Sequence, residues 1–454
     1  MKFINTMRRL CTLLSIVLLS FASFAQPGIN SPYSSSGIGE IGGMDHATAI
    51  GIGNSTITML DSSILNFYNP ASYNLMAKGQ PIFSFGLSSR ISNYQEGTIS
   101  SSSSITSIQH FALGFSLSNH FGLTFGLKPY SRRGYDFIGG TTIGTDSIKY
   151  NYSGEGGINE VFLGFSSDLI KLKNTRLAVG GNLGYLYGET VNTRKSGIVG
   201  SSSILSGGVG IESIRIKSIH YEFGTYLSHQ FNEWHQLTLS ATLDPLQKLK
   251  AISESGLYYS SNVNNPNVYD TLNFLSRDGF VSMAPSTTIG LNYKWSFGAT
   301  RNDDKNLNSE LSFHGTYNTT DWLKYNSTFD STGNNFNATS RITFGIQYSP
   351  ETQVITNAVT SKFYHRMKYR AGFYSYTLPN VYNNTQVKDF GTTFGIGIPI
   401  VIQKSLSSIN FGFAYGKRGT NDSQSLNETY YGINFGISIA PGSNEKWFRK
   451  TKLN

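Results

Sequence analysis

Residues 111–127 read Phe-Ala-Leu-Gly-Phe-Ser-Leu, then Ser-Asn-His, then Phe-Gly-Leu-Thr-Phe-Gly-Leu. In both halves of this stretch a large apolar residue alternates with a small or polar one. Successive side chains of a β-strand point to opposite faces of a sheet, so each half predicts a strand with one apolar face. The three residues between the halves predict a tight turn. The stretch therefore predicts a β-hairpin.

The same alternation recurs along the chain to residue 440, in segments of about 10–15 residues. Strands of soluble proteins typically have only ~5–6 residues. Long strands with one apolar face, and Ser, Thr, Asn, Gly, Lys or Glu on the other, are typical of transmembrane β-barrels. We therefore predict an all-β fold, a 14-stranded antiparallel transmembrane β-barrel, with strands near residues 81–96, 105–117, 121–130, 157–167, 175–190, 213–229, 235–249, 281–297, 307–318, 339–349, 364–377, 387–401, 407–417 and 427–440.

The connections between these segments alternate in length. Turns after even-numbered strands are mostly short, with 350–363 the exception, whereas four connections after odd-numbered strands are long: 131–156, 191–212, 250–280 and 319–338. Short periplasmic turns and long outer loops are typical of outer-membrane barrels. We expect the long connections to be polar loops, although a weaker strand pattern lies near 146–153. An even number of strands would place both termini in the periplasm.

Composition and charge exclude several other classes of protein. Charged residues make up 14% of the chain, against roughly 25% in an average soluble protein. The 39% of apolar residues argue against disorder. Beyond the first 25 residues, no apolar run approaches the ~20 residues of a transmembrane helix. The net charge of +9 is spread along the chain, so we expect no nucleic-acid partner.

Residues 1–25 have the features of a secretory signal peptide. Lys2, Arg8 and Arg9 precede an apolar stretch at 10–21, and Ser23-Phe24-Ala25 is a small-x-small cleavage site. Cleavage would remove three basic residues, lowering the formal charge from +9 to +6 (9 − 3), together with Cys11, the only cysteine. We therefore expect a Sec-exported protein without disulfides in the outer membrane of a Gram-negative bacterium.

Residues 26–80 show no strand pattern but contain many glycines and scattered Ile and Met. A free tether would be more polar, so this apolar content favours burial. We predict that 26–80 forms a hatch, a plug in or under the barrel lumen. The predicted barrel follows at 81–440, and a periplasmic C-terminal tail at 441–454.

The hatch also carries a pattern of motifs. Residues 47–54 read Ala-Thr-Ala-Ile-Gly-Ile-Gly-Asn, Asp-Ser-Ser-Ile follows at 61–64, and Tyr-Asn-Pro-Ala at 68–71 precedes the first strand. This pattern resembles the N-terminal hatch of the FadL/TodX family of outer-membrane transport proteins. Residues 30–33 and 444–450 resemble outer-membrane barrels of the Bacteroidota, where PorV-type barrels of the type IX secretion system are relatives. FadL proteins usually end in an aromatic residue, whereas this chain ends at Asn454.

The resemblance implies roles for two groups of residues. It implies that Asn69, Pro70 and Ala71 form a fixed corner that positions the hatch, because Pro70 fixes its own φ and restricts Asn69. Pro129, with Gly134 beyond it, interrupts the outer end of the third strand, since proline cannot donate to a β-ladder. By resemblance this interruption would be a kink that opens the barrel wall laterally. The alternatives are an ordinary turn at 69–71 and a proline that simply begins a loop.

No sequence motif indicates catalysis. Gly37–Gly42 matches the GxGxxG pattern but lacks the strand and helix that a dinucleotide site requires. The eight histidines have no metal-site spacing, and no GxSxG motif occurs. We predict no enzymatic activity, no cofactor and no metal, leaving open a catalytic set assembled from separate strands. The four tryptophans, near predicted strand ends, predict an interfacial girdle: Trp234, Trp295, Trp322 and Trp447.

The main functional hypothesis is a FadL-like transport protein. It would pass hydrophobic small molecules, such as long-chain fatty acids, across the outer membrane by hatch movement and lateral or periplasmic release. The alternative is a barrel subunit of a larger outer-membrane machine, such as the type IX secretion system, that binds protein rather than lipid. The expected partners are outer-membrane lipid, a hydrophobic ligand, the barrel-assembly machinery during insertion, and a protein at the outer loops or periplasmic face.

Overall fold

The computed structural model describes residues 30–42, 46, 48–78, 80–144, 146–199, 205–297, 309–329, 336–351, 362–382, 384–400, 407–420, 422 and 425–440. The predicted signal peptide and C-terminal tail lie outside these residues. Fourteen antiparallel strands form the barrel wall: β2 (Ile82–Glu96), β3 (Ile99–Ser116), β4 (Phe121–Arg132), β6 (Asp146–Lys171), β7 (Thr175–Val199), β8 (Leu205–Gln230), β9 (His235–Asp244), β12 (Ser286–Phe297), β13 (Ser309–Thr320), β15 (Thr339–Ser349), β16 (Lys368–Tyr382), β17 (Thr385–Ile400), β18 (Ser407–Gly419) and β19 (Asn427–Ile439).

The wall closes where the last strand meets the first. β19 pairs with β2 from Asn427↔Gln95 to Ile439↔Phe83, so every barrel strand has two barrel neighbours over part of its length. Closure satisfies the backbone hydrogen bonds of the wall, which a lipid environment requires. The predicted 14-stranded barrel is confirmed, and each of the fourteen predicted segments overlaps one barrel strand.

The remaining elements of the described residues are not among the fourteen strands of the barrel wall. They are β1 (Glu40–Ile41), β5 (Tyr135–Ile143), β10 (Gln247–Ser260), β11 (Tyr269–Met283), β14 (Asn326–Ser327) and seven 3₁₀ helices: η1 (Pro32–Ser35), η2 (Ile50–Ile52), η3 (Thr56–Thr58), η4 (Pro70–Leu75), η5 (Pro266–Val268), η6 (Trp322–Lys324) and η7 (Phe363–His365). No helix in the described part of the chain is long and apolar enough to cross a membrane.

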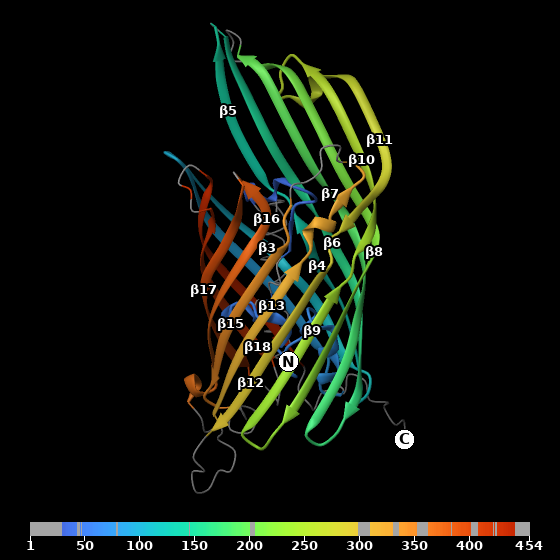
Figure 1. Cartoon of the computed structure of the whole chain (residues 1–454), viewed down its shortest axis with the longest axis vertical. Coiled ribbons are helices and arrows are strands. Elements are labelled where there is room, and N and C mark those ends of the chain that lie inside the picture. The colour runs from blue at the N-terminus through green and yellow to red at the C-terminus, as the bar shows by residue number, and fades with distance from the viewer. Residues whose placement is uncertain are drawn as a thin grey trace, which may run out of the picture.

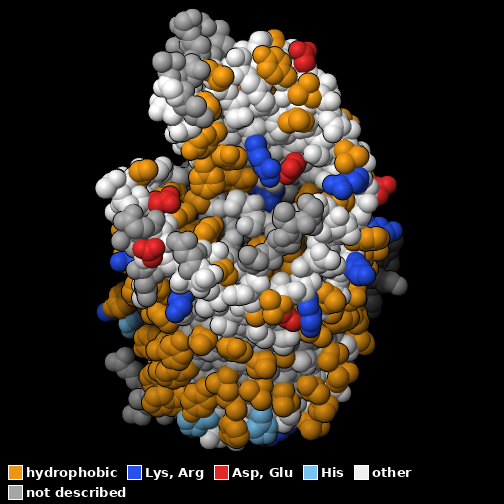
Figure 2. All heavy atoms as spheres, turned by 45° about the horizontal axis from the view of Figure 1, so that its top comes forward, with side chains coloured by type: hydrophobic (Ala, Val, Ile, Leu, Met, Phe, Trp, Pro, Cys, Tyr) orange, Lys and Arg blue, Asp and Glu red, His pale blue; other side chains and the backbone are white. Residues whose placement is uncertain are grey.

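The alternation in the sequence becomes two different faces of the wall. On β6 and β7, Leu163 and Leu183 point outward and are more than half exposed, whereas Glu160 and Asn182 point inward and are buried. The outward apolar side chains form a belt around the lower part of the molecule (Figure 2). Such a belt is the surface that faces lipid in outer-membrane barrels.

Three of the predicted long loops are strands, which corrects the sequence analysis. Connections 131–156, 191–212 and 250–280 continue the barrel strands as β5, the upper parts of β6, β7 and β8, and β10 and β11. These elements form a sheet in the order β5-β6-β7-β8-β10-β11 that rises above one side of the barrel (Figure 1). We call it the extension. The hydrophobic pattern missed much of it because a strand with water on both faces, such as β11 over residues 270–278, has no need of an apolar face.

Two prolines divide strands that the sequence predicted as continuous. The predicted strand 235–249 is split at Pro245 into β9 and β10, and 281–297 at Pro285 into β11 and β12. Proline cannot donate to the ladder, so the pairing changes at these points. Trp322 also differs from the predicted girdle: it is 8% exposed and packs against Tyr325 and Phe336 in the interior.

Candidate functional site

The N-terminal segment, residues 30–78, lies within the barrel (blue in Figure 1). Its helix η2 contacts β15 to β18, and η4 contacts β3, β4 and β6 to β8 on the other side. Six large or apolar side chains of this segment are completely shielded from solvent: Ala49, Ile52, Ile57, Phe67, Ala71 and Tyr73. The lumen is therefore filled by backbone and apolar side chains at this depth.

Lumen-facing glycines let this segment approach the wall. A Cβ added to Gly395 of β17 would stand 2.8 Å from the Cα of Gly51, and one added to Gly180 of β7 would stand 2.5 Å from the carbonyl carbon of Pro70. Real Cβ atoms do not come this close to backbone atoms, so only glycine fits these wall positions. The small residues on the lumenal face of the alternating pattern thus serve close packing.

The predicted corner rests on this wall. Asn69 is fully buried, and its Oδ1 accepts a hydrogen bond from the Ala71 N–H at 3.2 Å, which caps η4 at Pro70. Its Nδ2 donates to the Ile57 carbonyl at 3.2 Å. A Cβ on Gly224 of β8 would stand 2.5 Å from the Asn69 Oδ1. These contacts fix the corner in place, and its role in hatch movement stays a prediction.

Ion pairs tether the segment at two further points. The Arg418 guanidinium of β18 donates to both carboxylate oxygens of Glu40, each at 3.0 Å, and to Asp389 of β17 at 2.9 Å. Lys368 of β16 lies 2.6 Å from the Asp61 carboxylate. Arg418 is only 5% exposed, so its pairing is shielded from water and salt. The two tethers, at Glu40 in β1 and at Asp61 just after η3, hold the segment to the β16–β18 part of the wall.

Pro129 and Gly134 mark the place where β4 leaves β3. The β3–β4 ladder ends at Phe111↔Leu127, two residues before Pro129. Beyond it, β1 takes the place of β3, with Ile41↔Ser131 pairing. At Gly134 the N–H donates to the Ser34 Oγ at 3.0 Å. β4 runs through Pro129 to Arg132, with a shift of register against β6 between Pro129 and Ser131, and the N-terminal segment covers its other edge. A kink that opens the wall laterally stays a prediction.

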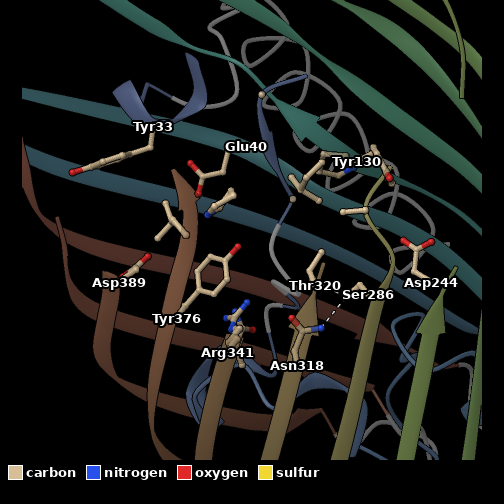
Figure 3. A pocket seen from close by; sticks show the side chains of 18 of the residues that line it. Tyr33, Glu40, Tyr130, Asp244, Ser286, Asn318, Thr320, Arg341, Tyr376 and Asp389 are labelled. Carbon is tan, nitrogen blue, oxygen red and sulfur yellow. Dashed lines mark hydrogen bonds between the residues drawn. The ribbon is translucent and has the colours of Figure 1, made fainter. Parts of the chain in front are cut away.

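A cavity of about 350 Å³ lies between this segment and the barrel wall (Figure 3). Glu40, Asp244, Arg341, Tyr376 and Asp389 come from different elements and surround the same space. Asn318 donates to the Ser286 Oγ at 2.9 Å along one side. The cavity lining therefore combines carboxylates, guanidinium groups, amides and hydroxyls with apolar side chains such as Ile38, Trp322 and Phe336.

Two clusters of ion pairs lie on opposite sides of this cavity. The first consists of Lys128, Glu160, His220, Glu222 and Asp244; in it Lys128 lies 3.1 Å from Glu222, and the His220 Nδ1 lies 2.9 Å from Glu160. The second consists of Glu40, Arg90, Asp389, Arg418 and Glu428; in it Arg90 lies 2.9 Å from Glu428. Most of these side chains are nearly or fully buried, and burial of charge is tolerated only in such paired arrangements.

Sequence reasoning missed both clusters. Their members lie on nine elements, from β1 to β19, and barrel closure alone brings them together. A signal was present, because Lys128, Glu160 and Arg418 occupy lumenal positions of otherwise alternating apolar strands. A charged residue at such a position needs a partner from another strand, but the register that chooses the partner is not readable from one strand.

The described residues contain no group of three or more His, Cys, Asp or Glu side chains arranged to hold a metal ion. The Gly37–Gly42 stretch lies against the wall at β4 and the cavity rather than between a strand and a helix. The charged side chains pair with one another, and Arg418 pairs with Glu40 of the N-terminal segment, so the arrangement suits holding that segment.

Comparison with solved structures identifies proteins with a similar fold. TodX, the toluene transporter of Pseudomonas putida, has a TM-score of 0.52 at 13% identity, covering 89% of this chain and 99% of that one. CymD, a monoaromatic hydrocarbon channel, has a TM-score of 0.51 at 12% identity, covering 89% and 99%. A Pseudomonas aeruginosa FadL homologue has a TM-score of 0.51 at 12% identity, covering 87% and 97%. The predicted FadL/TodX-like architecture is confirmed as a fold.

At 12–13% identity these structures show the fold alone, which fits an outer-membrane location. The expected lack of enzymatic activity stays a prediction. A Bacteroidota origin stays a prediction. No curated protein matches the chain by sequence. The sequence model of the BamG family matches residues 7–454. Because this match spans nearly the whole sequence, the chain belongs to the BamG family.

Proposed function

We propose that this protein is an outer-membrane subunit of the barrel-assembly machinery, which binds other polypeptides through the extension at one end of its barrel. The name of its family supports a link to barrel assembly. The proposal develops the machine-subunit hypothesis of the sequence analysis and replaces the type IX system with barrel assembly as the machine. The observation that carries it is the extension.

The extension is far larger than a membrane span requires. β6 and β8 have 26 residues each and β7 has 25, whereas a tilted transmembrane strand needs ~9–11. The additional residues stand in water, yet they expose large apolar side chains such as Ile138 (77%) and Leu272 (64%). Apolar side chains gathered on a water-exposed surface mark interaction sites. A tall sheet of this kind supports binding of protein rather than capture of a small molecule.

The lumen supports the same proposal. The N-terminal segment fills the lumen and is tethered to the wall through Arg418 and Lys368, so passage of a small molecule through the barrel would require these contacts to break. A lumen filled in this way supports a role in which the barrel anchors the extension rather than conducts a ligand.

The first test is isolation from the native outer membrane in mild detergent, followed by native mass spectrometry. We expect a species much heavier than one 50.0 kDa chain, containing barrel-assembly polypeptides. Depletion of the protein should then lower the amounts of other outer-membrane barrels in the membrane. A bare barrel together with unchanged barrel levels on depletion would overturn the proposal.

FadL-like transport of hydrophobic molecules is the second candidate. The fold supports it, and so does the interruption at Pro129, because the β3–β4 ladder ends there. Ligand would be captured near the extension, move past the hatch around Asn69 and leave laterally or into the periplasm. The native mass spectrum would then carry a releasable apolar adduct of a few hundred daltons. Deleting residues 26–80 without effect on uptake would contradict the gating mechanism.

A further inference from the structure

The extension ends in a β-strand whose outer edge is unpaired over most of its length. β11 pairs with β10 from Tyr269 to Met283. On its other side, the described part of the chain pairs with it only near its base, where β14 gives Val281↔Ser327 and Ser282↔Asn326. The Thr328 N–H also donates to the Phe280 carbonyl at 3.0 Å. Above this point, the backbone N–H and C=O groups that face away from β10 have no partner among the described residues.

This edge is also exposed on both faces. Nine consecutive residues, 270–278, are exposed, whereas lumenal and outward positions alternate between buried and exposed along barrel strands such as β17. Leu272, Phe274 and Leu275 are 64%, 55% and 47% exposed. These three side chains lie on a stretch, 271–276, that contains no charge, proline or glycine.

Natural proteins guard long free edges against pairing with other chains. The usual means are Lys or Pro on the edge, bulges, or a covering loop. Of these means, the stretch 271–276 has only a bulge, at Leu272, where the register to β10 shifts between Leu257 and Tyr258. Charges stand only at its ends, Asp270 on one side and Arg277 and Asp278 on the other. A weakly guarded apolar edge of this kind is a template that a partner strand can cover.

We propose that β11 binds an extended segment of a different polypeptide as an added antiparallel strand along residues 270–276. This inference rests on the proposed function, because it names where the partner of the extension docks. The β14 strand already pairs antiparallel to the base of the same edge, so the added strand continues an existing arrangement. Main-chain hydrogen bonds would supply affinity, and pockets beside Leu272, Phe274 and Leu275 would select apolar side chains.

The charges at the ends of the stretch and the direction of β11 restrict which polypeptide segments can pair with it. An antiparallel strand would place its start near Arg277 and Asp278 and its end near Asp270, so a basic residue near its C-terminal end complements Asp270. β11 runs from the tip of the extension toward the barrel, so the partner strand runs away from the barrel. A second copy in the same membrane has its β11 pointing in the same direction, so two β11 strands cannot pair antiparallel. The opposite edge strand of the extension, β5, runs away from the barrel and pairs only with β6 among the described residues, so a cross-link series from β11 to β5 of a second copy is the outcome that would overturn a different polypeptide as the occupant.

The test is photo-cross-linking from single positions of the full-length protein in its native membrane. A photoreactive amino acid replaces each residue from Thr271 to Ser276 in turn, and mass spectrometry identifies the residue that it reaches. We expect one partner segment at consecutive positions, with the partner residue number falling by one as the β11 number rises by one. Ser253 on β10, which is not at an edge, is the matched control and should give no such series.

A second measurement separates edge pairing from packing on a face. The double variant Leu272→Lys, Phe274→Lys should lower co-purification of the partner at least tenfold. Leu257→Lys on β10 is the control, since Leu257 is 50% exposed against 64% and 55% for the other two, and it should leave co-purification unchanged. Cross-links only from Asn273 and Leu275, which share one face, would overturn strand addition. A partner that co-purifies but cross-links nowhere on β11 would overturn this inference and leave the proposed function intact. Absence of any co-purifying polypeptide would overturn both.

Discussion

At the level of single residues, Arg418 connects the N-terminal segment to the barrel. It satisfies Glu40 and Asp389 together while being only 5% exposed. Arg418→Gln would leave these carboxylates with no cation in contact, and loss of one partner from a buried pair typically costs about 3–5 kcal/mol. We expect the midpoint of urea unfolding in liposomes to fall accordingly.

The control for this prediction is Arg194→Gln. Arg194 pairs with Glu212 at 3.3 Å on the extension, where the two side chains are 60% and 47% exposed. Exposed pairs contribute little to stability because water and salt screen them. An unchanged midpoint for Arg418→Gln would show that Arg418 does not hold the segment.

His46 makes the segment sensitive to acid. Burial lowers its pKa from 6.5 to about 4, and the charge of Arg370 acts in the same direction. The neutral ring donates from Nε2 to the Leu65 carbonyl at 3.1 Å and accepts the Thr48 N–H at Nδ1, 3.3 Å away. A proton on Nδ1 would abolish the second bond.

The sign of the pH effect follows from linkage. Because the folded pKa lies below the unfolded value, the unfolded chain binds the proton first, so stability is full above pH 6.5 and is lost as the pH falls toward about 4. The shift corresponds to about 3 kcal/mol. We expect protease cleavage within residues 30–78 to increase over this pH range. His46→Gln, which can make both bonds without titrating, should flatten the dependence, and an unaltered profile would contradict this origin.

At the level of elements, the fit between η2 and β17 depends on glycine. Gly395→Ala would bring a Cβ to 2.8 Å from the Gly51 Cα, and overpacking of this kind costs typically about 1–3 kcal/mol. Gly315→Ala on β13 is the matched control, since its nearest neighbour would be 4.0 Å away. Protease access to the segment should rise for Gly395→Ala alone. Equal protection in both variants would show that the segment does not pack on β17 as described.

β8 has a gap between its ladder with β10 and its ladder with β9, and one side chain bonds to the backbone there. β8 pairs with β9 from Phe223 onward and with β10 up to Ile216, leaving 217–222 between them. There the Gln247 side chain accepts from the Tyr221 N–H and donates to the Tyr221 carbonyl, both at 3.0 Å. The amide side chain thus takes the place of a backbone partner where Pro245 has interrupted the strand.

Gln247→Ala should therefore weaken the wall at this point. Leaving the Tyr221 backbone groups unsatisfied costs about 1–3 kcal/mol, and we expect faster hydrogen exchange of the Tyr221 amide. Gln236→Ala on β9 removes a bond to the Ser228 Oγ and leaves backbone pairing intact, so its exchange at Tyr221 should match the unmodified protein. Slow exchange in Gln247→Ala would mean that another group fills the gap.

At the level of the whole molecule, closure of the wall and filling of the lumen are separable. β19 pairs directly with β2, without any contribution from residues 30–78. We expect a chain lacking residues 30–78 still to form a barrel, and to show a higher conductance in planar bilayers than the full chain. Equal conductances would show that the segment does not limit the passage of ions.

The sequence determined the barrel and its strand positions. Alternation such as that of 111–127 is local: a strand between lipid and lumen needs an apolar side chain at every second position, so its face can be read without knowing its neighbours. The hatch motif was readable in the same way, since Asn69 and Pro70 shape their own backbone. Pro129 likewise acts on its own strand, and the register against β6 shifts just after it.

The tertiary structure alone decided three features. β11 is exposed on both faces over residues 270–278, so no alternation marked it as a strand, and β10, whose burial alternates near its base, was identified only by its pairing with its neighbours. The ion-pair clusters depend on the register among strands far apart in sequence, such as Lys128 and Glu222. The free edge of β11 exists only because no described strand follows it in the sheet. Each of these features arises from which chain segments become neighbours, a property that closure of the barrel sets and no single segment contains.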